Sequence, residues 1–101
     1  MRKKLLGAEH PDTIRSMGGL ASTYQMQGKL NEAEQLEIQV LDMRKKLLGT
    51  GHPDTIRSMG NLACIYHNQG KVKEAEQLDI QVLEMRKKLH IIQTLSEAWK
   101  I

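Results

Sequence analysis

The histidines and the lone cysteine are the side chains of this sequence best suited to catalysis or metal binding. Cys64 and His67 stand three residues apart, so on a helix they would share a face and could form an activated thiol or part of a metal site. No aspartate, asparagine or second histidine is spaced to complete either arrangement. His10 and His52 each precede a proline and an aspartate, where we expect a role at the start of a helix rather than metal ligation. We therefore expect a protein that is not an enzyme and that has no catalytic residue, metal or cofactor.

The basic residues are the next candidates, because a net charge of +3 would suit a nucleic-acid-binding surface. However, nine of the fifteen lysines and arginines lie in three copies of Met-Arg-Lys-Lys, at 1–4, 43–46 and 85–88. The second and third copies follow acid-rich segments, which is the order that a helix macrodipole favours, and they suit a solvated helix face. With one tryptophan and two tyrosines available for base stacking, we expect no nucleic-acid binding.

Cysteine content and hydropathy bear on where the protein works. One cysteine cannot form an internal disulfide, which favours a reducing compartment, so we expect a cytoplasmic protein. The longest uncharged runs, 16–28 and 58–70, are too short and too polar to cross a bilayer. Glu9 interrupts the basic start long before a signal-peptide core could form. We expect a soluble chain without membrane contact.

The Met-Arg-Lys-Lys phrase belongs to a much longer internal repeat. Residues 1–42 align with 43–84 without gaps and share 31 identical positions, and a third copy breaks off soon after residue 85. Within each unit, apolar residues three and four apart predict two helices. We expect helices over 12–27, 30–48 and 54–69, and a fourth from 72. A proline begins each first helix, and Gly28 or Gly70 ends it.

The third copy lacks the glycine and the proline that would end one helix and begin the next. The segment HIIQTLSEAWKI at 90–101 continues the apolar stripe, so we expect one helix over 72–100. The alternative is a bend near His90 that folds the tail back as a cap. A continuous helix would leave uncovered a set of apolar residues that we expect to join copies of the chain into a homodimer or higher oligomer. These are Leu89, Ile91, Ile92, Leu95 and Trp99.

Glycines inside the predicted first helices need a structural reason. Each of Gly18, Gly19 and Gly60 costs roughly 1 kcal/mol relative to alanine. We expect the close approach of a neighbouring helix to explain them, with a bound chain as the alternative.

The pattern resembles the tetratricopeptide repeat, in the 42-residue form found in kinesin light chains and in long arrays of fungal receptor-type NTPases. The segment HPDTIRSMGNLACIYHNQGKVKEAEQL at 52–78 and its counterpart at 10–36 carry the resemblance. Met17 and Met59 stand where shorter members usually have tryptophan, and Glu37 and Asp79 where they usually have an aromatic ring. The resemblance implies an all-α, right-handed α-α superhelix of two 42-residue helix-turn-helix repeats with an extended C-terminal helix. We divide the chain into the tail of a truncated preceding repeat (1–7), two repeats (8–49 and 50–89) and a non-repeat helical extension or cap (90–101).

The resemblance also implies a function. In this family the first helices line a concave face that holds a peptide or a partner protein. We expect that face to include positions off the packing stripe: Arg15, Ser22, Gln25, Met26, Arg57, Cys64, His67 and Asn68. The repeats differ at several of these positions, through ligand selection or through drift of an unselected surface. We therefore expect a protein-binding scaffold. The alternative is a purely structural module that assembles with its own copies and has no separate ligand.

Overall fold

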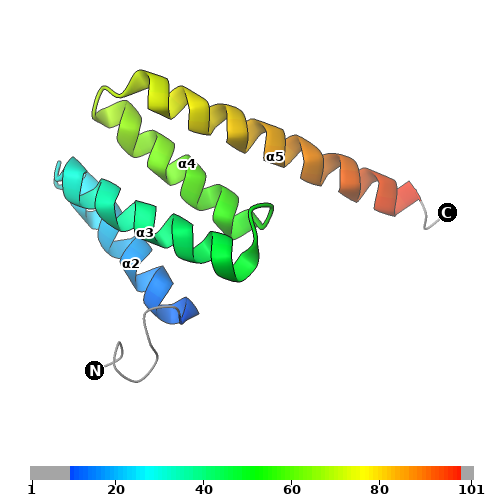
Figure 1. Ribbon diagram of the computed structural model, residues 1–101, viewed down its shortest axis with the longest axis horizontal. Coiled ribbons are helices and arrows are strands. Elements are labelled where there is room, and N and C mark those ends of the chain that lie inside the picture. Colours follow the sequence, from blue (N-terminus) through cyan, green and yellow to red (C-terminus); the bar gives the residue numbers. More distant parts are fainter. Residues whose placement is uncertain (1–9, 99–101) are drawn as a thin grey trace.

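The computed structural model describes residues 10–98, which form four helices. They are α2 (Pro11–Met26), α3 (Leu30–Leu48), α4 (Pro53–Asn68) and α5 (Val72–Ala98). The helices form two hairpins, and each helix packs against the next: α2 on α3, α3 on α4 and α4 on α5 (Figure 1). The described part of the chain contains no strand. The all-α repeat architecture is confirmed, and the predicted starts and ends of the first three helices differ from those observed by no more than one residue.

Both first helices begin with the same capping arrangement. The Nδ1 atom of His10 accepts a hydrogen bond from the backbone nitrogen of Asp12 at 3.1 Å, and His52 does the same for Asp54 at 3.0 Å. Each histidine therefore satisfies an amide that the helix leaves without an internal partner, and the proline after it needs none. The predicted helix-start role of the two histidines is confirmed.

Glycine ends each first helix. Gly28 and Gly70 adopt φ values of +80° and +81°, which side-chain-bearing residues rarely occupy. The amides of Lys29 and Lys71 then turn back to the carbonyl oxygens of Tyr24 and Tyr66, both at 2.8 Å. This turn lets the second helix of each hairpin run back along the first.

The core of the molecule lies around α4. Leu41 of α3 packs with Met59 and Leu62 of α4, and partly buried side chains of α3, α4 and α5 surround them. Seven residues of α4 are buried, against two in α2, although the two helix sequences are nearly identical. The difference arises because α4 lies between α3 and α5, whereas α2 packs mainly against α3.

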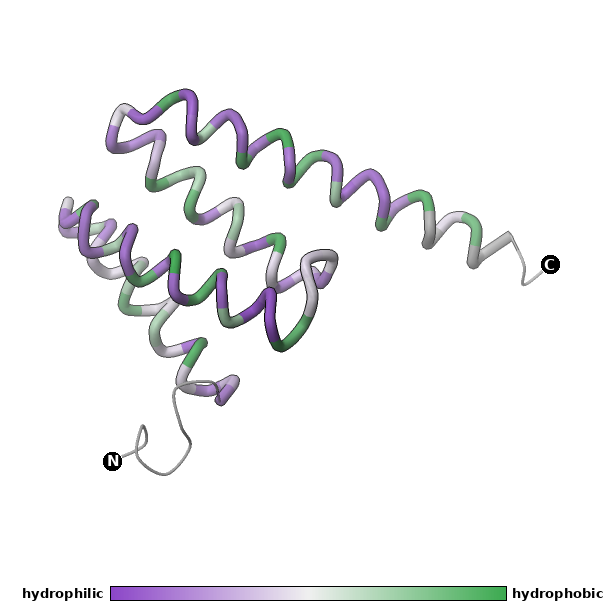
Figure 2. Tube along the Cα trace, viewed as in Figure 1, coloured by the Kyte–Doolittle hydropathy of each residue, from purple (hydrophilic) through white to green (hydrophobic). Residues whose placement is uncertain are grey.

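The last helix runs unbroken from Val72 to Ala98, with no interruption at His90, and extends well past the end of α4 (Figure 1). Apolar positions recur along this whole length (Figure 2). Among the predicted self-association residues, Leu89 is half-buried, and Ile91 and Leu95 are exposed. The side chain of Ile92 and all of Trp99 lie outside the described part of the chain, as do residues 1–7.

The expected reason for the internal glycines is wrong. Among the described residues, a Cβ atom built on Gly18, Gly19 or Gly60 would meet no neighbouring atom within 4 Å. No neighbouring helix approaches these positions closely enough to exclude a side chain.

No helix within the described residues has the length and apolar character needed to span a membrane.

Candidate functional site

The residues predicted to form the binding face lie on α2 and α4, and all but one are exposed. Gln25 is half-buried, while Met26 is 88% exposed. The exposed ones are Arg15, Ser22, Met26, Arg57, Cys64, His67 and Asn68.

Two of these residues meet across the repeats. The Nε2 amide of Gln25 donates to the Sγ atom of Cys64 at 3.3 Å, so the C-terminal halves of α2 and α4 contribute to one surface. His67 has a different partner: its Nε2 atom lies 3.0 Å from the Oδ2 atom of Asp79 on α5. Within residues 10–98, no group of three metal-ligating side chains comes together. Cys64 and His67 thus have separate structural partners.

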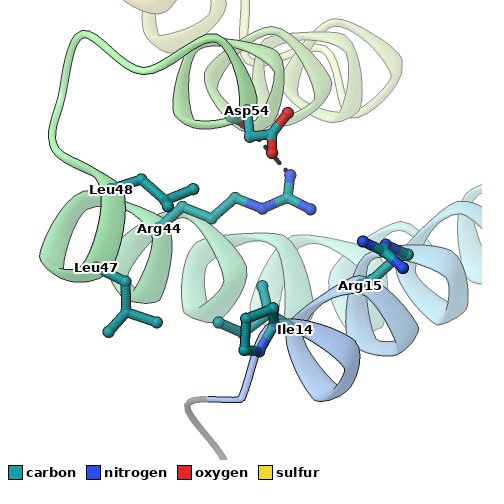
Figure 3. Close-up of a pocket in the computed structure, with 7 residues that line it drawn as sticks. Ile14, Arg15, Arg44, Leu47, Leu48 and Asp54 are labelled. Atoms are coloured by element: carbon teal, nitrogen blue, oxygen red, sulfur yellow. Dashed lines mark hydrogen bonds between the residues drawn. The ribbon is translucent and has the colours of Figure 1, made fainter.

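Arg15 and Arg57 lie at the other end of the first helices, where each lines a surface hollow. The first hollow has a volume of about 120 Å³ (Figure 3), and its walls are Pro11, Ile14, Arg15, Arg44, Leu47, Leu48 and Asp54. The second has a volume of about 230 Å³ and is lined by Pro53, Ile56, Arg57, Arg86 and Leu89. Every residue of the second hollow stands 42 positions after a residue of the same type in the first. Each repeat therefore builds the same hollow from an apolar floor and two arginines.

Arg44 is a residue of this region that the sequence analysis missed. Its side chain crosses from α3 to α4, where it donates to the Oγ atom of Ser58 at 2.8 Å and to the carbonyl oxygen of Asp54 at 3.3 Å (Figure 3). In return, the hydroxyl of Thr55 donates to the carbonyl oxygen of Arg44 at 3.3 Å. The basic clusters were expected to lie on a solvated face, and Arg44 departs from that expectation.

A sequence signal for this inward position does exist. Arg44 follows Val40 by four residues and Leu41 by three, and both are buried. It therefore continues the packed side of the helix, whereas Lys45 and Lys46 point away from it and are exposed.

The junction between the repeats also holds a buried acid. Glu37 on α3 is 2% exposed, and its Oε1 atom has no hydrogen-bond partner among the described residues. Burial raises the pKa of Glu37 to about 7, and the nearby positive charge of Arg44 only partly opposes that shift.

A second polar contact closes the other end of the junction. The side chains of Gln69 and Lys71 donate to the Oε1 atom of Glu34 at 2.8 and 3.1 Å. The hydrogen bond from Gln69, together with the hydrogen bond and charge of Lys71, lowers the pKa of Glu34 against a smaller effect of burial. The two repeats are thus joined by polar contacts at both ends and by apolar packing between them.

A family model described as tetratricopeptide repeat matches residues 13–54 and 55–90. Among solved structures, the chain is similar to a crystal structure of nearly identical TPR-like repeats from Podosopora anserina, attributed to a kinesin light chain, with 35% sequence identity and a TM-score of 0.75. The match covers 87% of this chain and 42% of that one. A glutamine-to-methionine variant of the same repeats matches at 34% identity and a TM-score of 0.75, covering 88% of this chain and 42% of that one. This chain therefore spans less than half the length of those structures. No curated protein matches it.

Proposed function

Since this chain belongs to the tetratricopeptide repeat family, whose repeats generally mediate protein–protein interaction, we propose that it is a non-catalytic scaffold that holds a peptide or partner protein. The ligand face is formed by α2 and α4, together with the residues of α3 and α5 that line the two hollows. The observation that carries the proposal is the recurrence of one arginine-rimmed apolar hollow in each repeat. A ligand at the second hollow would meet Arg57 and Arg86. In the first hollow, Arg44 already donates to Ser58 and to the carbonyl oxygen of Asp54, and Arg15 lies near Asp12.

The chemistry of the hollows indicates the ligand class. Ile56 and Leu89 offer an apolar floor, and the exposed guanidinium of Arg57 lies beside it. Among the described residues, no carboxylate lies within 4.0 Å of Arg57 or Arg86, whereas Arg15 lies 3.7 Å from an exposed carboxylate oxygen of Asp12. An acidic peptide, or a peptide C-terminus with an apolar side chain, would supply both a carboxylate and an apolar group.

The test is a peptide-array screen of acidic and C-terminal peptides, followed by titration of those that bind. Arg57→Ala should weaken binding roughly tenfold to a hundredfold, because a hydrogen bond to a charged group contributes on the order of 1.5–3 kcal/mol. Lys45→Ala is the matched control, since it removes an exposed charge outside both hollows and should leave affinity unchanged. If Arg57→Ala alters no interaction, the arginine-rimmed hollow is not the ligand site.

Nucleic acid is not part of the proposed ligand class. Filter binding at two salt concentrations tests this, because binding through the basic clusters would weaken steeply as salt rises. Tight binding that shows this salt dependence would contradict the proposal.

A second candidate function, favoured by exposed apolar residues on α5, is association of copies of this chain. Leu83, Ile91 and Leu95 are 54%, 55% and 57% exposed on a helix that extends past its neighbour. The proposed contact set is Leu89, Ile91, Ile92, Leu95 and Trp99. Light scattering coupled to size exclusion tests it: a monomer that persists at high concentration rules association out, and an oligomer that survives Trp99→Glu rules out the tail as its cause. Association without any peptide ligand would leave the chain a purely structural module.

The same proposal divides the chain into two repeat units, 8–49 and 50–89, with flanking segments at 1–7 and 90–101. It also places the protein in the cytoplasm. The alignment of residues 1–42 with 43–84 without gaps supports the division into repeat units. The single free cysteine, which is exposed, supports a reducing compartment.

A further inference from the structure

The junction between α3 and α4 shows how one repeat docks on the next. Leu41 of α3 and Leu62 of α4 lie in one apolar cluster and are 6% and 4% exposed. Beside them, Arg44 donates to Ser58 at 2.8 Å. The junction thus has one half on the second helix of a repeat and a complementary half on the first helix of the next repeat.

The 42-residue period places a second copy of each half at one end of the molecule. Helix α5 repeats the α3 half, with Glu76, Leu83 and Arg86 at the positions of Glu34, Leu41 and Arg44. Helix α2 repeats the α4 half, with Ser16, Leu20 and Gln27 at the positions of Ser58, Leu62 and Gln69. These six residue types are identical to those in the junction, although Asp79 stands in place of the buried Glu37, so α5 and α2 carry largely matching surfaces.

Neither end surface is covered in the described part of the chain. Leu83 is 54% exposed and Leu20 is 44% exposed, although their counterparts in the junction are buried. The hydroxyl of Thr13 is buried and has no hydrogen-bond partner among the described residues. Its counterpart Thr55 donates to the carbonyl oxygen of Arg44, so the group that would satisfy Thr13 is a carbonyl in the place of Arg44. The 42-residue period gives that place to Arg86 of another copy and also to Arg2 of the same chain, which lies outside the described residues.

We propose that a second copy of this chain docks its α2 on α5 in the way that α4 docks on α3. Leu20 of the second copy then packs against Leu83, and Arg86 donates to Ser16. This inference rests on the proposed self-association through α5 and names the surface that α5 binds. Pairing two α5 helices instead would leave Leu20 and Thr13 uncovered. Because the two docking surfaces differ, the same contact can add a third copy, and association is open-ended rather than limited to a dimer.

The test uses one variant for each surface. Leu20→Glu blocks the α2 surface, and Leu83→Glu blocks the α5 surface. Both residues are substantially exposed, so circular dichroism and thermal unfolding of the monomers should match the unmodified protein. In light scattering over a concentration series, the unmodified mass should rise beyond two chains, whereas each variant alone stays monomeric. An equimolar mixture should form a dimer and nothing larger, because one intact α5 meets one intact α2. Gln39→Glu, at an exposed position of α3 outside both docking surfaces, is the matched control and should associate as the unmodified chain does.

Each contrary result has a separate meaning. An unmodified chain that stays monomeric overturns both the head-to-tail contact and the self-association on which it rests. A Leu20→Glu variant that still dimerises overturns the head-to-tail contact alone and indicates α5 paired with α5. A mixture that yields no dimer also overturns the head-to-tail contact. Should either leucine variant lose helical content, Ser16→Arg supplies the same test, since it sets a positive charge against Arg86 and should prevent association.

Discussion

At the scale of single residues, the carboxyl group of Glu37 couples the repeat junction to pH. Its burial against α4 disfavours the charged form and raises its pKa from 4.5 to about 7. The charge of Arg44 offsets only part of that cost. Near neutral pH the junction therefore contains an acid that is only partly ionised. A neutral side chain in its place would not carry the free-energy cost of burying a charge.

Replacing Glu37 by glutamine should remove a pH dependence of stability. Because the folded-state pKa is raised, the contribution of Glu37 is fully present below pH 4.5 and is lost as pH rises through about 7. The full loss is on the order of 3 kcal/mol, from 1.36 kcal/mol per pKa unit, and most of it falls between pH 5 and pH 8. Urea unfolding should show that the free energy of unfolding falls less between pH 5 and pH 8 in Glu37→Gln than in the unmodified chain. Asp42→Asn, at an exposed position of the same helix, is the control and should not reproduce this effect. Equal pH slopes for Glu37→Gln and the unmodified chain would contradict the prediction.

Truncating a capping histidine should weaken the helix that it begins. His52→Ala removes the acceptor of the Asp54 amide hydrogen and should lower the free energy of unfolding by about 1 kcal/mol. His52→Asp keeps a capping acceptor and should retain most of the stability. The midpoint of urea unfolding measures both variants, and an unchanged midpoint for His52→Ala would show that the cap contributes nothing.

At the scale of helices, local signals in the sequence predicted most of what was observed. The histidine caps, the prolines and Gly28 and Gly70 act within a few residues of themselves, so helix limits follow from the chain alone. The hollows could not be predicted in this way, because the first one needs residues of three helices to meet. Arg44 points inward because of its angular position on the helix, which the repeated Met-Arg-Lys-Lys sequence does not reveal when its basic residues are read as one cluster.

The internal glycines offer a direct way to strengthen α4. Gly60→Ala should raise the free energy of unfolding by about 0.5–1 kcal/mol, because alanine loses less backbone freedom on folding and its Cβ meets no neighbouring atom within 4 Å. Gly70→Ala is the matched control, since φ is +81° there and the same substitution should destabilise the protein. Thermal unfolding of the two variants measures the difference. Destabilisation by Gly60→Ala would show that the position needs glycine after all.

At the scale of the whole molecule, the helices form a stack in which each one packs against the next in the sequence. The described arrangement measures 49 × 38 × 19 Å, and each helix contacts mainly its neighbours in the sequence. Stability in such a stack is close to a sum of the helix hairpins and the junctions between them. The position of a helix in the stack therefore matters as much as its sequence, which the nearly identical α2 and α4 demonstrate through their different burial.

Hydrogen exchange should resolve this difference between two helices of nearly the same sequence. Amides of α4, which lies between α3 and α5, should exchange more slowly than those of α2, which has fewer buried residues. Mass spectrometry of peptides from the two helices measures the rates under one condition, so intrinsic sequence effects largely cancel. If copies stack head to tail, the exchange of α2 should slow as protein concentration rises, since the docked α5 of another copy gives α2 a second neighbour. The Leu20→Glu variant should show no such concentration dependence, and equal protection of α2 and α4 in dilute solution would contradict the assignment of the core to α4.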